Sequence, residues 1–516
     1  MTAVVFPATP APPRATVRDW GALAVLMLPV LLVSIDGTVL GFALPSIAAT
    51  LGPTAAQQLW IIDVYPLVLA GLLVSMGSLG DRFGRRRLLL LGATGFAAMS
   101  VVAAYSPTAV ALIAARAGLG FFGAMLMPST LSLLRNIFAD PQQRRLAIAV
   151  WASFFAAGAA LGPIVGGFLL EHFWWGSVFL MAVPVLIPLL VLAPIFVPES
   201  RDPNPGRIDP VSIALSLLAL TPIVYAVKSL AKGGDVLSVV LPLAVGVVAT
   251  ALFIRRQLHR PDPMLDVRLF TNRRFSGAVA VNLLSVFSLV GFMFFVSQHL
   301  QLVVGMSPMD AGWALVPGLI TMMVAGLYVV RAVRWIAPST VVVWGMLASA
   351  AAYAVVAAFA SPESTLAVLI AFAMLGVGIG AAETLSNDMI VSSVPAEKAG
   401  AASAVSETAY ELGSVLGTAV LGSILAGAYA ANLVLPAGVT GAQADTAAET
   451  LAGAHHTAAQ LPADTAAALI DSAGHAFDAG VTVTSAIGVG LMLVAAWIAH
   501  RTLREPSSSA ERTAAQ

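Results

Sequence analysis

The chain has 516 residues, of which 59% are hydrophobic and only 10% are charged. Soluble domains use about 25% charged and about 45–50% apolar residues, so a bilayer must act as solvent for much of this chain. The formal net charge is zero and there is no cysteine. The charge balance gives no sign of a nucleic-acid partner, and the lack of cysteine excludes disulfides, thiol catalysis and thiolate metal sites. The composition predicts an all-α integral membrane protein.

The apolar segments are long enough to cross a membrane as helices, because the hydrocarbon core requires about 20 residues. We predict fourteen of them, at 20–44, 58–79, 88–106, 108–134, 147–170, 175–197, 210–230, 236–256, 275–301, 311–331, 338–360, 364–392, 399–427 and 479–500. Residues 428–478 contain no Lys or Arg. We expect them to form a long outer loop with short amphipathic helices.

The basic residues indicate the orientation of these spans. Nearly all of the 26 Lys and Arg residues fall in the two tails or in loops on the same side as the N-terminus. Cytoplasmic loops of membrane proteins carry such an excess of positive charge. We therefore expect both termini to be cytoplasmic, with Arg116 inside a span and Lys228 and Lys232 near an outer end.

Two proline-rich segments, 198–210 and 257–274, interrupt the series of spans. Their prolines cannot continue a helix, and they enclose two spans between two sets of six. The predicted order is a cytoplasmic tail (1–19), an N-terminal six-helix half (20–197), a linker with two extra spanning helices (198–274), a C-terminal six-helix half (275–500, including the outer loop 428–478) and a cytoplasmic tail (501–516).

The loop after the second span contains Gly77, Asp81, Arg82, Gly84 and Arg85 within the run Gly77–Arg87. A tight turn needs glycine, and pairing of Asp81 with arginine gives the turn rigidity. An ordinary positively charged loop would explain the arginines but not the placed glycines and aspartate. The run resembles the loop signature of the major facilitator superfamily. That resemblance implies that these five residues form a latch that holds the two halves together on the cytoplasmic side.

The fifth span carries Gly158, Gly162, Pro163, Gly166 and Gly167. Glycines four residues apart give one smooth helix face for close packing, and proline removes a backbone hydrogen bond and bends the helix. General helix packing explains part of the pattern. The pattern is also similar to the antiporter signature of drug:proton exchangers in this superfamily, which implies export in exchange for protons.

Three charged residues inside spans are candidates for proton coupling. An aspartate in an apolar span costs about 2.5–3.5 kcal/mol on insertion scales, so Asp36 and Asp63 are functional candidates. Asp36 lies about 24 Å along its span from the cytoplasmic end, and Asp63 lies at a similar depth. Residues Ile35–Val39 resemble the first-span signature of fourteen-span drug exporters. Arg116 needs an acidic partner, and a purely structural role is the alternative for each acid.

The late spans carry a second group of acids, Glu383, Glu407 and Glu411, with Tyr410 beside them. Glu407 and Glu411 are four residues apart and therefore share a helix face. The surrounding sequence resembles that of fourteen-span pumps for quaternary ammonium dyes and biocides, which implies that these residues bind substrate. Phe292 and Phe295 are candidates for cation–π contact with a flat cation, and packing in the core or against lipid is the alternative.

The resemblance covers residues 20 to 500 and implies the major facilitator fold. It also implies proton-coupled export of lipophilic or quaternary ammonium cations, including dyes, biocides and fluoroquinolones, from the bacterial inner membrane. No cofactor and no nucleic-acid partner are implied, and we expect a monomer in the lipid bilayer. The alternatives are export of an endogenous lipid, peptide or siderophore, then a nutrient symporter, then an enzyme or receptor. His455, His456 and His475 have no acidic or thiol co-ligands at ligand spacing, so we expect no metal site.

Overall fold

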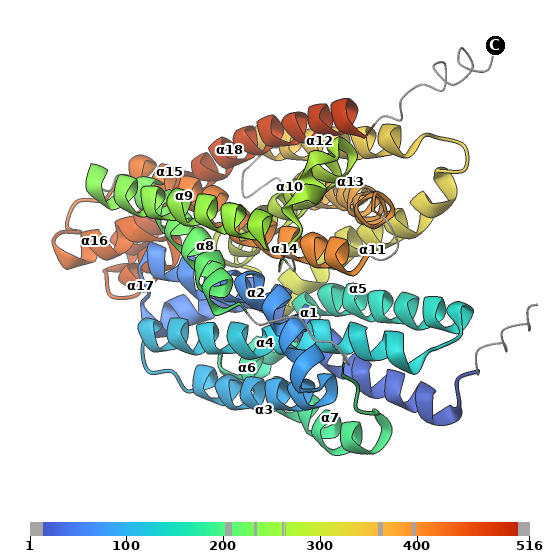
Figure 1. The fold of residues 1–516 in the computed structure, drawn as a ribbon. Coiled ribbons are helices and arrows are strands. Elements are labelled where there is room, and N and C mark those ends of the chain that lie inside the picture. The colour runs from blue at the N-terminus through green and yellow to red at the C-terminus, as the bar shows by residue number, and fades with distance from the viewer. Residues whose placement is uncertain are drawn as a thin grey trace, which may run out of the picture.

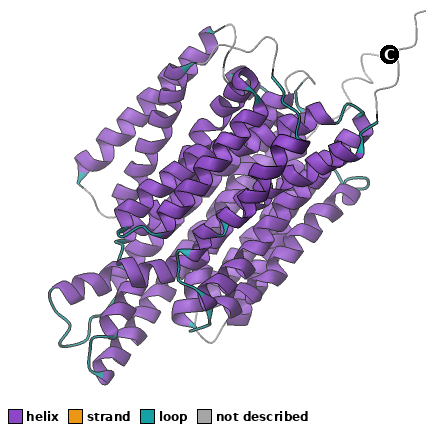
Figure 2. Cartoon of the chain, turned by 90° about the horizontal axis from the view of Figure 1, so that it is seen from below, coloured by secondary structure: helices purple, strands orange, loops and turns teal. Residues whose placement is uncertain are grey.

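The computed structural model describes residues 14–201, 209–231, 235–260, 263, 265–359, 365–394 and 399–503. The expected tails at 1–19 and 501–516 and the two linkers lie partly outside the described residues. In the described part, helices are joined by loops, without any strand (Figure 2). Thirteen of these helices are long and apolar enough to cross a membrane, or 14 when a bent helix is included as one span. The all-α membrane class is confirmed.

The first group of spanning helices shares one apolar core. It consists of α1 (Val17–Leu51), α2 (Ala55–Phe83), α3 (Arg85–Ala104), α4 (Ala109–Ile137), α5 (Pro141–His172), α6 (Ser177–Leu180) and α7 (Ala182–Phe196), and we call it the N-terminal group. Local sequence sets several of the ends. Gly52 ends α1 in the left-handed region at φ 55°, which glycine adopts without strain. The Thr54 side chain accepts from the backbone N–H of Gln57 and so caps α2.

The second group has its own large apolar core, which Phe42, Leu44 and Leu59 of the N-terminal group join. In this core the rings of Phe292 and Phe372 stack 5.5 Å apart. It begins with α10 (Arg273–Gln298), which continues into the π-helical turn η2 (His299–Val303), and then has α11 (Pro308–Ala332), α12 (Pro338–Phe359) and α13 (Thr365–Ser392). It ends with α14 (Ala399–Gly417), the π-helical turn η5 (Thr418–Gly422), α15 (Ser423–Asn432) and α18 (Ala463–Thr502). We call it the C-terminal group.

Two further spanning helices, α8 (Pro210–Ala231) and α9 (Val236–His259), form an antiparallel pair. Gly246 allows α9 to approach α8 closely, because an added Cβ would lie 3.0 Å from the carbonyl oxygen of Ala219. Only 22% of the α8 window and 11% of the α9 window is buried, so most of their surface is left to lipid. The short 3-10 helix η1 (Val267–Thr271) follows and leads into α10.

The region expected as the loop 428–478 is more helical than predicted. It contains α16 (Ala442–Glu449) and α17 (Leu451–Ala458), but α15 runs into it as far as Asn432 and α18 begins at Ala463. The last span is therefore one end of a 40-residue helix rather than the separate segment 479–500. Alanine-rich sequence favours helix, and the buried polar residue Asp478 of α18 contacts His299 of η2 at 3.1 Å.

The two ends of the bundle differ. One end, the arginine face, carries Arg85, Arg135, Arg256 and Arg501, which lie near the ends of their helices. The other end, the α16–α17 face, carries the two short helices (Figure 1). Several close contacts between the two groups lie toward the α16–α17 face. There the Ser297 hydroxyl of α10 donates to the carbonyl of Gly41 in α1 at 3.0 Å, and Leu59 of α2 lies against Gly422.

Candidate substrate and proton site

Asp36 and Arg116 form an ion pair inside the N-terminal group. Arg116 Nη1 of α4 lies 2.8 Å from Asp36 Oδ2 of α1, and their side chains are 2% and 5% exposed. Arg116 Nε also donates to the carbonyl of Ile61 in α2 at 3.1 Å, and its guanidinium lies 4.6 Å from the centroid of the Tyr65 ring. The acidic partner that a buried arginine requires is therefore Asp36, and one side chain joins α1, α2 and α4.

The glycines of α5 bring this helix against α1 on both sides of Asp36. A Cβ at Gly158 would lie 2.8 Å from the carbonyl oxygen of Leu31, and one at Gly166 would lie 2.8 Å from Val39 Cγ2. A Cβ at Gly162 would overlap the Thr38 hydroxyl. The glycine pattern therefore fixes the stretch of α1 that carries Asp36.

Pro163 frees a backbone carbonyl that α1 then uses. Proline has no N–H, so the carbonyl of Ala159 loses its helical partner. The Thr38 hydroxyl donates to this carbonyl at 3.2 Å. Next to it, α5 bends by 40° between Leu146–Ala159 and Leu161–His172. The residue two positions after Asp36 is thus tied to the bend in α5.

The other side of the same motif contacts the C-terminal group. A Cβ at Gly167 would lie 2.7 Å from Met309 Cα of α11, and one at Gly312 would lie 2.6 Å from the Pro163 carbonyl oxygen. These contacts lie toward the α16–α17 face. The α5 motif therefore packs against α1 within the N-terminal group and against α11 of the C-terminal group.

Asp63 belongs to a different ion pair. Its Oδ2 lies 2.8 Å from Lys228 Nζ of α8, and the two side chains are 0% and 3% exposed. The structure therefore pairs Asp63 with Lys228, whereas the sequence had grouped it with Asp36 and Arg116 as a proton-coupling residue. The sequence did not predict that Lys228 is the partner of Asp63. The signal available in the sequence was a lone lysine within an apolar helix, which calls for a buried acidic partner.

Glu383, Glu407 and Glu411 come together between α13 and α14. Glu407 lies within electrostatic range of both Glu383 and Glu411, and Tyr410 lies within range of all three. Glu411 is 8% exposed, and Glu407 and Glu383 are half-buried. The arrangement concentrates negative charge beside an aromatic ring, as the shared helix face of Glu407 and Glu411 predicts.

Aromatic residues of the N-terminal group complete this region. The ring of Phe155 in α5 packs edge-on to Tyr410 at 5.9 Å and stacks on Trp151 at 6.0 Å. Tyr65 of α2 lies within electrostatic range of Asp36 and Arg116 and also of Glu407 and Glu411. Tyr65 therefore lies near both the Asp36–Arg116 pair and the residues Glu407 and Glu411. Trp151 and Phe155 were not predicted, although their four-residue spacing along α5 places them on one helix face.

Phe292 and Phe295 are buried in the core of the C-terminal group. They are 0% and 1% exposed, and their rings contact each other at 4.8 Å within the core of the C-terminal group. Phe292 also packs edge-on to Tyr353 at 5.7 Å. That these rings bind substrate stays a prediction; in this structure they fill the core, as large aromatic side chains commonly do.

The predicted latch lies at the arginine face. Arg85 Nη2 contacts Asp81 Oδ1 at 2.7 Å, and the backbone N–H of Arg85 donates to the carbonyl of Ser200 after α7 at 2.9 Å. Gly84 has φ 112°, and a Cβ there would lie 2.8 Å from the Glu199 carboxylate, so glycine is required. Gly77 faces Pro128 of α4, and Arg82 is exposed. These contacts of Asp81 and Arg85 stay within the N-terminal group and the segment after it.

The outer histidines do not gather with other ligands. Within the part of the chain that the structure describes, no three His, Cys, Asp or Glu residues come together in a way that would hold a metal ion. His455 Nε2 lies 3.0 Å from the carbonyl oxygen of Leu302, and burial lowers the pKa of this histidine from its usual value. His475 lies 3.7 Å from Asp471 at the surface.

A model of the major facilitator superfamily matches residues 26–418 of the chain. The chain belongs to the major facilitator superfamily. This major facilitator is 57% identical over 488 residues to the multidrug efflux pump LfrA of Mycolicibacterium smegmatis, which covers 95% of this chain and 97% of that protein. It is 37% identical to the methyl viologen resistance protein SmvA of Salmonella typhimurium, over 93% of this chain and 97% of that one. The resemblance noted in the sequence is confirmed.

Other comparisons agree on the fold. The tetracenomycin C resistance and export protein of Streptomyces glaucescens is 33% identical, over 96% of this chain and 93% of that protein. The crystal structure of a bacterial homologue of the human lysosomal transporter Spinster superposes with a TM-score of 0.66 at 17% identity, over 96% of this chain and 100% of that one. This major facilitator is therefore a multi-pass membrane transporter and not an enzyme.

Proposed function

We propose that this major facilitator is a proton-coupled multidrug exporter of the bacterial inner membrane that carries lipophilic and quaternary ammonium cations. The observation that carries the proposal is the cluster of Glu383, Glu407 and Glu411 around Tyr410, where the N-terminal and C-terminal groups meet. The names of two relatives, which specify multidrug efflux and methyl viologen resistance, support it. We also propose that the protein acts as a monomer.

The chemistry of the cluster favours a cationic substrate. Unpaired carboxylates in a membrane interior are costly, and a cation that enters among them relieves this cost. Tyr410 and Phe155 add aromatic faces and edges, and a ring face attracts a cation such as a quaternary ammonium group. Protons neutralise the same carboxylates. Protons and cationic drugs therefore compete for one set of groups, and this competition gives exchange without direct contact between them.

The arginine face is the cytoplasmic one in this proposal, because positive residues collect on that side of a membrane. The first residues of α1 and the last residues of α18 lie at this face, so both termini are cytoplasmic in this proposal. Several close contacts between the two groups lie toward the opposite, outer face. This pattern supports an inward-facing arrangement in which the carboxylates are reached from the cytoplasm and closed from outside. The latch of Asp81 and Arg85 would then engage the C-terminal group only in the outward-facing arrangement.

Transport of ethidium into everted membrane vesicles tests this function. We expect vesicles that contain the protein to accumulate ethidium when an inside-acid pH gradient is imposed, and to lose this accumulation when the gradient is dissipated. Vesicles with Glu411→Gln should accumulate less at equal protein level, and vesicles with Asp471→Asn, a change at an exposed acid, should match the wild type. Accumulation that is independent of the gradient would refute proton coupling.

A further inference from the structure

The ion pair between Asp63 and Lys228 joins the N-terminal group to the extra helix α8. Both side chains are nearly or completely buried, and Lys228 Nζ also lies 4.0 Å from the centroid of the Trp60 ring. A cation over an aromatic face is further stabilised where water is excluded. Lys228 is therefore held by two residues of α2, one turn apart.

The C-terminal group reaches the same place. The side chain of Thr418, the first residue of the π-helical turn η5, faces the Asp63 carboxylate. Around this point Leu67 of α2, Val224 of α8 and Val415 of α14 form a small apolar cluster of their own. Asp63 thus lies where α2, α8 and η5 meet, in the closure toward the α16–α17 face. π-Helical turns of this kind occur frequently at functional sites.

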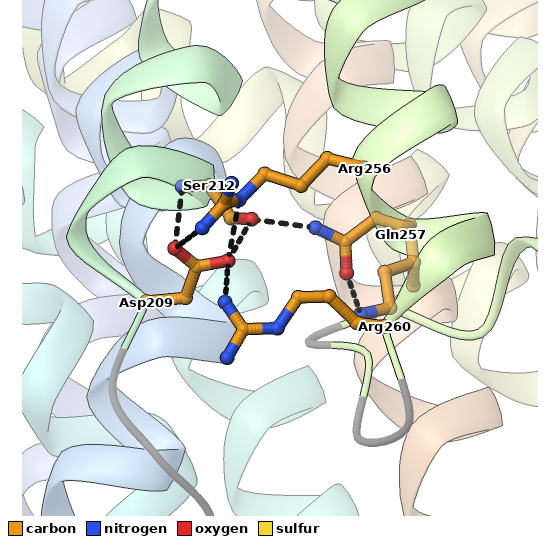
Figure 3. A network of polar contacts seen from close by, with 6 residues as sticks. Asp209, Ser212, Arg256, Gln257 and Arg260 are labelled. Atoms are coloured by element: carbon orange, nitrogen blue, oxygen red, sulfur yellow. Dashed lines mark hydrogen bonds and ion pairs between the residues drawn. The ribbon is translucent and has the colours of Figure 1, made fainter.

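A second polar network fastens α8 to α9 at the arginine face (Figure 3). Asp209 accepts from Arg256 Nε and Nη2, both at 2.9 Å, and also pairs with Arg260. Gln257 Nε2 donates to the Ser212 hydroxyl at 2.7 Å. Hydrogen bonding by the Arg256 guanidinium holds the pKa of Asp209 well below its usual range. The α8–α9 pair is therefore closed at one end and attached to α2 by Lys228 near the other.

Stability alone gives a weak reason for a buried ion pair. An apolar pair of similar volume is often equally stable or more stable, whereas removal of one partner leaves a costly unpaired charge. If the outer closure opens during transport, as the proposed function requires, η5 must leave α2 and expose Asp63 on one side. Lys228 would remain beside Asp63, because α8 is attached to α2 and not to η5 by this pair. The lysine then prevents Asp63 from being left without a partner in either arrangement.

We propose that Lys228 is a positioning residue of the transport cycle, which stays paired with Asp63 and makes the α8–α9 pair move with the N-terminal group as the closure between α2 and η5 opens and shuts. This inference rests on the proposed function, because it assumes alternating access. It means that the two extra helices take part in transport and are more than lipid-facing additions to the two groups.

Four variants separate a working pair from a structural one: Lys228→Met, Asp63→Asn, the double neutral variant with both changes, and the exchange of Asp63→Lys with Lys228→Asp. Each single change should lower ethidium turnover at least about tenfold, because one buried charge loses its partner. The double neutral variant should be present in the membrane at the wild-type level, because no unpaired charge remains. Its turnover should stay low. The exchange should recover at least half of the turnover. Leu230→Met, at an exposed position of α8, is the control.

A second measurement needs no transport. The chain has no cysteine, so Leu59→Cys introduces a single thiol at a position that is 4% exposed in the closure beside Gly422. Lys228→Met leaves Asp63 buried and unpaired in the closed arrangement, and opening to water relieves this. A membrane-impermeant maleimide added from outside should therefore label Leu59→Cys several-fold faster with Lys228→Met than without it, and the exchange variant should restore the slow rate.

The inference is overturned if the double neutral variant transports at the wild-type rate, or if Lys228→Met changes neither the turnover nor the labelling rate. The two proposals can fail separately. Loss of proton-driven ethidium transport in the wild type, with the expected shift in labelling, would refute the proposed function and leave the role of Lys228 in the closure standing. Proton-driven transport in the wild type, with unchanged labelling and turnover in all variants, would support the proposed function and refute the role of Lys228.

Discussion

At the scale of single residues, the buried charges organise the protein. Asp36 pairs with Arg116, and Asp63 pairs with Lys228. The sequence predicted that Asp36 and Asp63 are functional candidates, because a charge in an apolar span is costly. It did not predict the pairing, because the partners are far apart along the chain and only the packing of α1 on α4 and of α2 on α8 brings them together. Similarly, an aromatic stripe in α10 does not reveal that Phe292 turns into the core.

Substrate charge should distinguish the carboxylates of the cluster from other parts of the site. We expect Glu411→Gln and Glu383→Gln to reduce resistance to cationic drugs about tenfold, and resistance to neutral or zwitterionic drugs much less. A dication should be affected most, since it can contact two carboxylates at once. Growth inhibition by ethidium, a bis-cationic biocide and a neutral dye, at matched protein level, measures the difference. Equal losses for the three compounds would mean that these acids do not select charge.

Asp209 gives a prediction about pH. Its pKa is held below the usual value by Arg256, so its contribution to stability is present above the ordinary carboxyl pKa of about 3.9 and is lost as the pH falls below it. Asp209→Asn should lower the Tm of the purified protein by a similar amount between pH 5 and 8, and the difference should shrink below about pH 4. Asp235→Asn, at the exposed start of α9, is the control. A constant difference at all pH values would contradict this role of the charge.

At the scale of elements, the spans were predictable and their ends were not. Hydropathy located the spanning helices, because a bilayer demands about 20 apolar residues from each. It missed the continuation of α18 back to Ala463, because Asp471, His475 and Asp478 make that stretch polar by composition although its alanines favour helix. The glycines of α5 were recognised as a packing face, but the structure adds that they fix the turn of α1 beside Asp36.

Gly162 provides a test of this packing. A Cβ at this position would overlap the Thr38 hydroxyl, so Gly162→Ala should displace α1 next to Asp36 and lower ethidium turnover about tenfold or more, since small displacements of reacting groups have large kinetic effects. Adding Thr38→Ala to Gly162→Ala should restore part of the turnover because it removes the overlapping atom. Gly490→Ala, where an added Cβ meets nothing within 4 Å, should be silent. If Gly162→Ala is silent too, the close approach is unimportant.

At the scale of the whole molecule, two groups of helices, each with a large apolar core, meet toward the α16–α17 face. The division expected from the prolines, with halves at 20–197 and 275–500 and a linker at 198–274, remains a prediction. The family signatures were specific enough to predict the fold. The position of the α8–α9 pair could not be predicted from the sequence. The only signal in α8 was Lys228, which calls for an acidic partner but does not say which one.

The latch at the arginine face should act on rates rather than on substrate binding. Asp81→Asn removes the partner of Arg85, which lies 2.7 Å away, and should slow turnover several-fold with little change in the KM for ethidium. Arg85→Gln should have the same effect, and Arg334→Gln, at an exposed arginine of the α11–α12 loop, should have none. A raised KM with normal turnover would place the loop in the substrate site instead.

The central claim is that a cationic drug and a proton are exchanged by one protein, and the movement of protons tests it most directly. Everted vesicles are first acidified inside, and their luminal pH is followed with a fluorescent dye as ethidium is added. The account predicts that ethidium makes the lumen less acidic in wild-type vesicles and leaves it unchanged in vesicles with Asp36→Asn at equal protein level. Ethidium uptake without any proton movement in the wild type, or undiminished proton movement in the variant, would contradict it.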